Sequence, residues 1–155
     1  MSYVWSSDLE TGEAAIDNQR RQLLSSVSAL FDTRKSSKEQ QEVKETMKFM
    51  LAYTIEHFAD EEQLQKTYSY PGYREHKALH DEFKKAAQEL AEELYQATPT
   101  DEFISKACSI VGGWMFNHIT DEDSRMAAYV KKKKAELVSS CRERRTVIMR
   151  AASKR

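Results

Sequence analysis

The chain has 155 residues, of which 40% are hydrophobic and 32% are charged, and its net charge is −1. This length fits one domain with a real core, and the lack of any apolar run of about 18 residues excludes a membrane-spanning helix. Only 4 glycines and 2 prolines interrupt a sequence rich in helix-forming residues, so we expect helix almost throughout.

Apolar residues recur at helical spacing in four stretches. The first helix is expected over about residues 13–31, and the second over about 38–66, with Ser36 or Ser37 as its cap. Pro71-Gly72 then predicts a turn. A third helix is expected over about 73–96, and a fourth begins near residue 101 with Thr100 as its N-cap.

Four amphipathic helices joined by short loops predict an all-α fold, an antiparallel up-down four-helix bundle with an extended C-terminal helix. We assign residues 1–130 to this bundle and residues 131–155 to a basic helical extension or linker. The opening MSYVWSSDLE lacks a basic and an apolar signal segment, and Cys108 and Cys141 are far apart without metal-type spacing. These features predict a reducing, cytoplasmic location.

The extension is basic, since residues 131–155 hold ten Lys or Arg and two Glu, a charge of +8, against −9 for the rest. Val130, Leu137, Cys141 and Ile148 form a weak heptad within it. A coiled-coil contact to a second chain or a further domain, and a frayed basic tail, are both compatible with this pattern. Cys141 could crosslink a dimer, although an inert buried thiol is the simpler expectation. Nucleic-acid binding is disfavoured, because the segment has no aromatic residue to stack on a base.

All four histidines belong to one pattern of helical spacings. Glu61 follows His57 by four residues, His76 and His80 are four apart, and three acids closely follow His118 in HITDED. Residues four apart lie on one face of a helix, so these side chains project together. Imidazole and carboxylate groups are ligands for iron, manganese or zinc, and helical bundles build metal sites from facing helices. A chance surface pair would explain one such spacing but not all of them, and we predict a metal site.

The carboxylate of the last helix is ambiguous from geometry. Glu122 lies four residues after His118 and shares its face, whereas Asp123 lies five after it and is rotated by about 140° in a regular helix of about 3.6 residues per turn. Asp123 could join the site if the helix is locally bulged, as π-bulges at functional sites are, or if it served the far side of a metal pair.

With these motifs, the chain resembles the bacterial form of the hemerythrin family over about residues 3–130. The family pattern appears here as an early Trp5, IDNQR at 16–20, HFADEE at 57–62, HKALH at 76–80 and WMFNHITDED at 114–123. The resemblance implies a non-haem di-iron centre in a four-helix bundle, with dioxygen bound at the iron that has fewer protein ligands and reduced to peroxide.

The resemblance also implies a ligand set. One iron would be held by His76, His80 and His118, and the other by His57 and a histidine of the first helix. Glu61 and Asp123 would bridge the two irons together with an oxo or hydroxo group, so the family selects Asp123 over Glu122. Tyr53 and Met115, one turn before His57 and His118, could line a dioxygen pocket, although both are also ordinary core residues.

The chain departs from the family at the first-helix ligand, where Arg20 replaces histidine. Arginine stays protonated and has no free lone pair, so it cannot bind a metal. We favour a hypothesis in which both irons bind, solvent fills the vacant position, and Arg20 points away to pair with Asp17 or an outer oxygen of Glu61. Alternatively, one iron binds at the three histidines and the guanidinium replaces the other, or the site is vestigial.

The leading functional hypothesis is a dioxygen-binding or redox-sensing domain that signals through its last helix to an output module such as a diguanylate cyclase. Family members of this kind are joined to signalling modules, and an attached output domain could be enzymatic even though this domain is expected to sense rather than catalyse. The alternatives are a free-standing oxygen carrier or store, and a small di-iron enzyme with oxidase, peroxidase-like or nitric oxide reductase activity.

Overall fold

A computed structural model describes residues 5–33, 40–96 and 100–152. Four long helical segments make up most of this part, and the described residues form no strand. A short 3-10 turn, η1 (Ser7–Leu9), precedes α1 (Ala14–Thr33), and α2 (Gln40–Thr67) and α3 (Tyr73–Gln96) follow. These bounds lie within about two residues of those expected from the apolar spacing. The caps expected at Ser36 or Ser37 lie outside the described residues.

The fourth segment is one continuous rod with two irregular turns. It passes through α4 (Asp101–Ala107), the π-helix η2 (Cys108–Gly113), α5 (Trp114–Asn117), the π-helix η3 (His118–Asp123) and α6 (Ser124–Ala152). Thr100 caps its start as predicted, because its hydroxyl accepts a hydrogen bond of 3.1 Å from the backbone N–H of Phe103.

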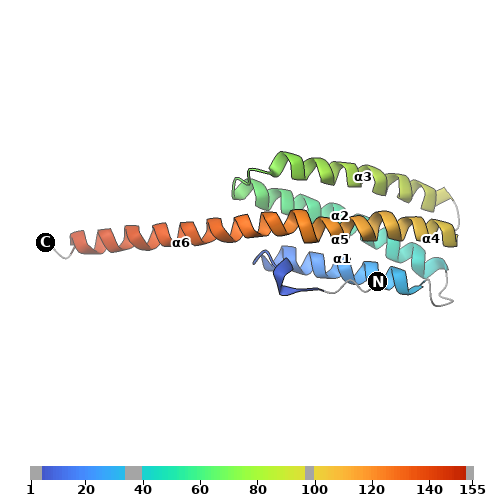
Figure 1. Cartoon of the computed structure of the whole chain (residues 1–155), viewed down its shortest axis with the longest axis horizontal. Helices are drawn as coiled ribbons and strands as arrows, with labels where there is room; N and C mark the ends of the chain where they lie inside the picture. Colours follow the sequence, from blue (N-terminus) through green and yellow to red (C-terminus); the bar gives the residue numbers. More distant parts are fainter. Residues whose placement is uncertain (1–4, 34–39, 97–99, 153–155) are drawn as a thin grey trace.

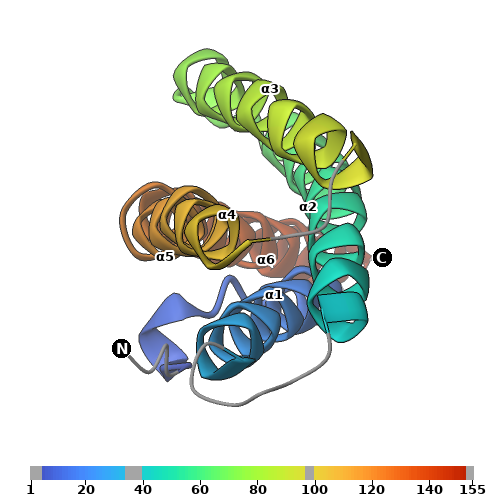
Figure 2. The same ribbon diagram turned by 90° about the vertical axis from the view of Figure 1, so that its right-hand side faces the viewer.

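The four segments pack as a bundle around a common core, as the end-on view in Figure 2 shows. The core joins apolar residues from every segment, among them Leu23, Phe58, Phe83 and Ile119, each no more than 2% exposed. The predicted all-α four-helix bundle is therefore confirmed. Burial of these stripes is what stabilises such helices, since helices gain most of their stability from tertiary packing.

The last helix projects far beyond the ends of the other three (Figure 1). Lys134 still reaches the start of α1, with its ammonium 2.6 Å from a Glu13 carboxylate oxygen. Beyond that point the large apolar side chains that the structure describes are exposed: Leu137 is 56% exposed and Val138 57%. Cys141 is also exposed within the single chain, so the expected buried thiol is wrong here. The helix therefore continues past the bundle, and in its described part no other helix of the chain packs against these apolar side chains.

No helix in the described part of the chain is both long enough and apolar enough to cross a membrane.

Candidate metal centre

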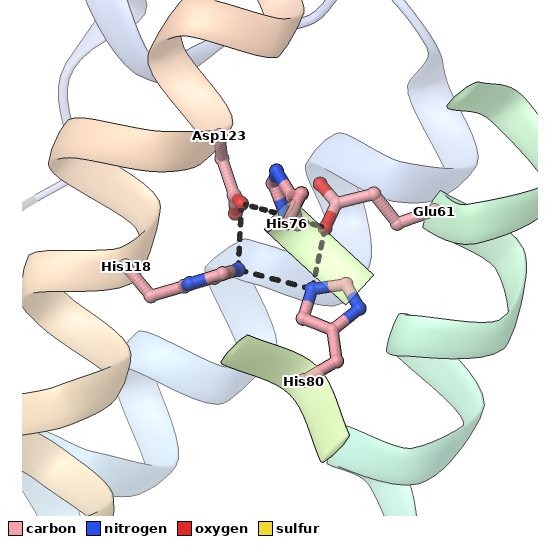
Figure 3. A group of neighbouring side chains, drawn as sticks. All are labelled: Glu61, His76, His80, His118 and Asp123. Carbon is pink, nitrogen blue, oxygen red and sulfur yellow. Dashed lines mark hydrogen bonds and ion pairs between the residues drawn. The ribbon is translucent and has the colours of Figure 1, made fainter. Parts of the chain in front are cut away.

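Five predicted residues meet at the centre of the bundle (Figure 3). Glu61 comes from α2, His76 and His80 from α3, and His118 and Asp123 from the two ends of η3. One donor atom from each lies within 4.8 Å of all the others, and all five side chains are buried. Three segments that are remote in sequence thus bring three imidazoles and two carboxylates to one point.

The π-helix η3 explains why Asp123 rather than Glu122 lies in the cluster. A π-helical turn closes i→i+5 hydrogen bonds, so it brings residues five apart onto the same face. His118 and Asp123 are the first and last residues of η3, and the His118 Nε2 lies 3.0 Å from Asp123 Oδ1. Glu122 is instead turned outward, where it pairs with Arg125. The bulge considered from the sequence is therefore present.

Aromatic rings hold two of the imidazoles in place. Phe58 stacks on His80 with ring centroids 3.8 Å apart, and Trp114 stacks on His118 at 4.3 Å. Trp114 also packs on Phe83, which ties both rings to the core. Stacked apolar rings exclude water from one side of each imidazole and restrict its rotation. The sequence marks Phe58 and Trp114 only as apolar neighbours and carries no signal of this stacking.

Glu62 orients His80 from outside the cluster. A Glu62 carboxylate oxygen lies 3.2 Å from His80 Nδ1, and Lys84 lies 3.2 Å from the same oxygen. Burial opposes the charged form of Glu62, but the contacts with His80 and Lys84 outweigh it and lower the pKa of this carboxyl. A carboxylate on the outer nitrogen leaves the inner nitrogen of the ring free to bind a metal. Sequence reasoning missed this residue, because its partner is 18 positions away.

The electrostatics of the cluster favour charged carboxylates. Burial opposes ionisation of Glu61, yet its 3.3 Å contacts with the His76 and His80 imidazoles hold the pKa of this carboxyl well below its usual range. Burial and repulsion by Glu61 raise the pKa of Asp123, but Arg20 and His118 outweigh them and the net shift is downward. Burial lowers the pKa of His76, but its contacts with these two carboxylates raise it to about 9. Negative charge held in a buried place attracts cations.

Arg20 lies inside the bundle and belongs to the same cluster of charges. Its side chain is 0% exposed, and its Nη2 donates to Glu61 Oε1 at 2.8 Å and lies 3.1 Å from Asp123 Oδ2. The expected direction, away from the site towards Asp17, is wrong, because Asp17 accepts hydrogen bonds from Thr11 instead. The expected pairing with Glu61 is present. The guanidinium therefore occupies space beside the two carboxylates on the α1 side.

His57 is buried close by, but outside the group of five. Its Nδ1 lies 3.3 Å from the Gln19 side-chain oxygen, and its Nε2 has no hydrogen-bond partner. Burial lowers the pKa of His57, which disfavours the charged form of the ring. The sequence-predicted ligand is therefore in the core, separated from the other three histidines.

The two residues suggested for a dioxygen pocket have ordinary surroundings. Met115 is fully buried in the hydrophobic core, and Tyr53 stacks on Phe49 with ring centroids 5.2 Å apart. Both placements agree with the core alternative, and a role in binding dioxygen stays a prediction.

The donor atoms fit a metal ion. Among the described residues, buried polar atoms without a hydrogen-bond partner gather here: both nitrogens of His76, Glu61 Oε2 and both oxygens of Asp123. Unpartnered buried polar atoms cost free energy, and a cation at the centre would satisfy those that face it, His76 Nε2, Glu61 Oε2 and Asp123 Oδ1. Three imidazole nitrogens with two carboxylates suit iron, manganese or zinc.

Comparison with known proteins gives a consistent result. The family model described as hemerythrin HHE cation-binding domain matches residues 14–130. The bacteriohemerythrin of Pseudomonas paraeruginosa is 30% identical over 135 residues, covering 87% of this chain and 86% of that protein. The bacteriohemerythrin of Stenotrophomonas maltophilia is 31% identical over 140 residues, covering 90% and 87%.

The fold agrees with these relatives. The crystal structure of wild-type hemerythrin superposes with a TM-score of 0.68 at 22% identity, covering 82% of this chain and 96% of that one.

Proposed function

This chain belongs to the hemerythrin family, and we propose that it is an iron-binding domain whose redox state, or binding of a small ligand such as dioxygen, is transmitted through α6. The observation that carries the proposal is the buried group of three histidines and two carboxylates. The family binds non-haem iron, and iron supplies the capacity to change oxidation state or take up a small ligand.

The side chains of the site have distinct roles in this proposal. His76, His80 and His118 supply nitrogen ligands, while Glu61 and Asp123 supply negative charge and oxygen ligands. The contact from Glu62 and the stack on Phe58, both from α2, fix the position of the His80 ring, and the stack on Trp114 from α5 fixes that of the His118 ring. Rings held in this way need little rearrangement when a metal binds.

The route for a signal follows from the position of η3. His118 and Asp123 are its two ends, and α6 continues from it without a break. A change in how these two residues bind a metal would act on the base of the projecting helix through a π-turn, an irregular turn that is frequent at functional sites. The exposed apolar residues Leu137, Val138 and Met149 are available to an output module or a second chain. We place the domain boundary near residue 130, between the bundle and the projecting part of the last helix.

A free-standing oxygen carrier is the second candidate. Its support is that the bacterial relatives are named bacteriohemerythrins and that this chain spans 86–87% of their length. A carrier of the family type requires two irons, so a single iron per chain would exclude it. Two irons with solvent in the vacant position are one form of the proposed iron-binding domain. The contacts of Arg20 favour the other form, in which one iron binds at the three histidines.

The test uses the full chain reconstituted with ferrous iron without oxygen. We expect the chain to retain iron. We also expect backbone hydrogen exchange over residues 124–152 to change when the iron is oxidised or exposed to dioxygen. The half of α3 that lies beyond His80 serves as an internal control. Loss of all iron on desalting would rule out the metal function. Retained iron with unchanged exchange in α6 would reject signalling and favour the carrier.

A further inference from the structure

Each of the two carboxylates of the site has one oxygen in contact with Arg20 and the other in contact with the histidines. Its Nη2 contacts Glu61 Oε1 at 2.8 Å and Asp123 Oδ2 at 3.1 Å. The other oxygen of each carboxylate faces the histidines: Glu61 Oε2 lies 3.3 Å from His80 Nε2, and Asp123 Oδ1 lies 3.0 Å from His118 Nε2. His76 Nε2 is 3.3 Å from both of these inner oxygens.

From this division we propose that the guanidinium of Arg20 is the permanent second cation of the site, so that the chain binds one iron, at the three histidines. The inference rests on the proposed function, because it concerns the same metal site. Each carboxylate would bridge a metal on one side and a guanidinium on the other, in place of a bridge between two metals.

The position of Arg20 is fixed independently of any metal. Its Nη1 donates a hydrogen bond of 2.8 Å to the carbonyl oxygen of Leu9, and its side chain is among the largest that are fully buried. Burial opposes its charge, yet Asp123 and Glu61 outweigh burial and raise its pKa further. A guanidinium held by three oxygens has no low-cost route out of the core.

The charge balance supports a single metal. Two carboxylates, one guanidinium and one ferrous ion sum to a single positive charge, whereas a second ferrous ion would raise the sum to three in a buried place. Like charges that share a buried site repel strongly, because the surroundings screen them poorly. Of the predicted ligands in the described part of the chain, only His57 lies outside the group of five, and Gln19 already contacts its Nδ1.

A single iron also limits the chemistry. One ferrous ion gives up one electron on oxidation to ferric iron, whereas reduction of dioxygen to peroxide needs two. A one-iron site therefore lacks the two electrons of family-type oxygen binding. It retains one-electron oxidation of the iron by an external acceptor, which fits a redox sensor better than a carrier.

The experiment compares the unmodified chain with Arg20→His and with the control Arg21→His. Arg21 is the adjacent arginine, but it lies at the surface with a side chain 42% exposed and pairs with Glu10. Each protein is reconstituted with excess ferrous iron without oxygen and desalted, and iron per chain is measured by elemental analysis. After oxidation, the EPR spectrum distinguishes an isolated high-spin ferric ion, which gives a signal, from a spin-coupled ferric pair, which gives none.

We expect one iron per chain and an isolated ferric signal in the unmodified chain and in Arg21→His, and two irons with loss of signal in Arg20→His. Two coupled irons in the unmodified chain would overturn the inference and leave the proposed function intact. No iron in any protein would overturn the proposed function itself.

One iron in a folded Arg20→His, checked by circular dichroism, would show that the guanidinium is not what excludes the second metal. If Arg20→His does not fold, the iron content and EPR spectrum of the unmodified chain still decide how many irons it binds.

Discussion

At the residue scale, the site depends on side chains that do not touch the metal position. Glu62 holds His80 by its outer nitrogen, Phe58 and Trp114 hold two rings by stacking, and Gln19 contacts His57. Residue type and helical spacing predicted the histidines and Glu61. They could not predict these supports, because the contacts join helices whose relative rotation is set by core packing.

Glu62→Gln tests this supporting role. Replacing the carboxylate by an amide removes the charge that polarises His80, and outer-shell changes of this kind lower metal affinity by about 10–100-fold. The measurement is competition for ferrous iron against a chelator of known affinity. Glu56→Gln, an exposed position on the same helix, is the matched control and should leave the affinity unchanged. Equal affinities in the two variants would contradict the role of Glu62.

At the scale of the element, the π-turn η3 decides which acid serves the site. The sequence places three acids after His118, and regular helical geometry favours Glu122. The resemblance to the family favours Asp123, and the structure places Asp123 among the donors because η3 spans five residue steps from His118. The four helices themselves could be read from apolar spacing, since α-helices with a buried stripe have a clear period.

Asp123→Asn and Glu122→Gln form a matched pair at this turn. Asp123 is fully buried between Arg20 and His118, so removing its charge should destabilise the metal-free protein by about 3–5 kcal/mol. The Glu122 side chain is 29% exposed in a pair with an exposed Arg125, and its loss should cost about 1 kcal/mol or less. Urea unfolding of both metal-free variants measures the difference. Similar losses in the two variants would mean that Asp123 is not held in the buried network.

At the scale of the whole molecule, the chain joins a packed bundle to a projecting helix. Lys134 of α6 still contacts the segment that leads into α1, through the Glu13 carboxylate and the Gly12 carbonyl. Leu137, Val138 and Met149 beyond it are exposed, and a helix without a buried face adds little to stability. The projection is therefore expected to serve a contact with another domain or chain rather than the stability of the bundle.

Ending the chain after Lys134 tests this division. We expect the thermal midpoint and the iron per chain to stay unchanged, because the core and the five donor residues all precede that point. Calorimetry and elemental analysis measure the two quantities, and sedimentation of both chain lengths shows whether the projection mediates a dimer. A large drop in the thermal midpoint of a monomer would contradict the division.

The sequence by itself determined the helices, their order and the residue types of the site, because helical periodicity and metal-ligand chemistry are local properties. It also showed that Arg20 cannot bind a metal. Only the tertiary structure decided where that guanidinium points and which acid joins the histidines. Those two outcomes depend on the packing of α1 against α2 and on a π-turn in the last helix. The position of the guanidinium is set by groups far from Arg20 in sequence, Leu9, Glu61 and Asp123, and a periodic pattern within one helix carries no information about them.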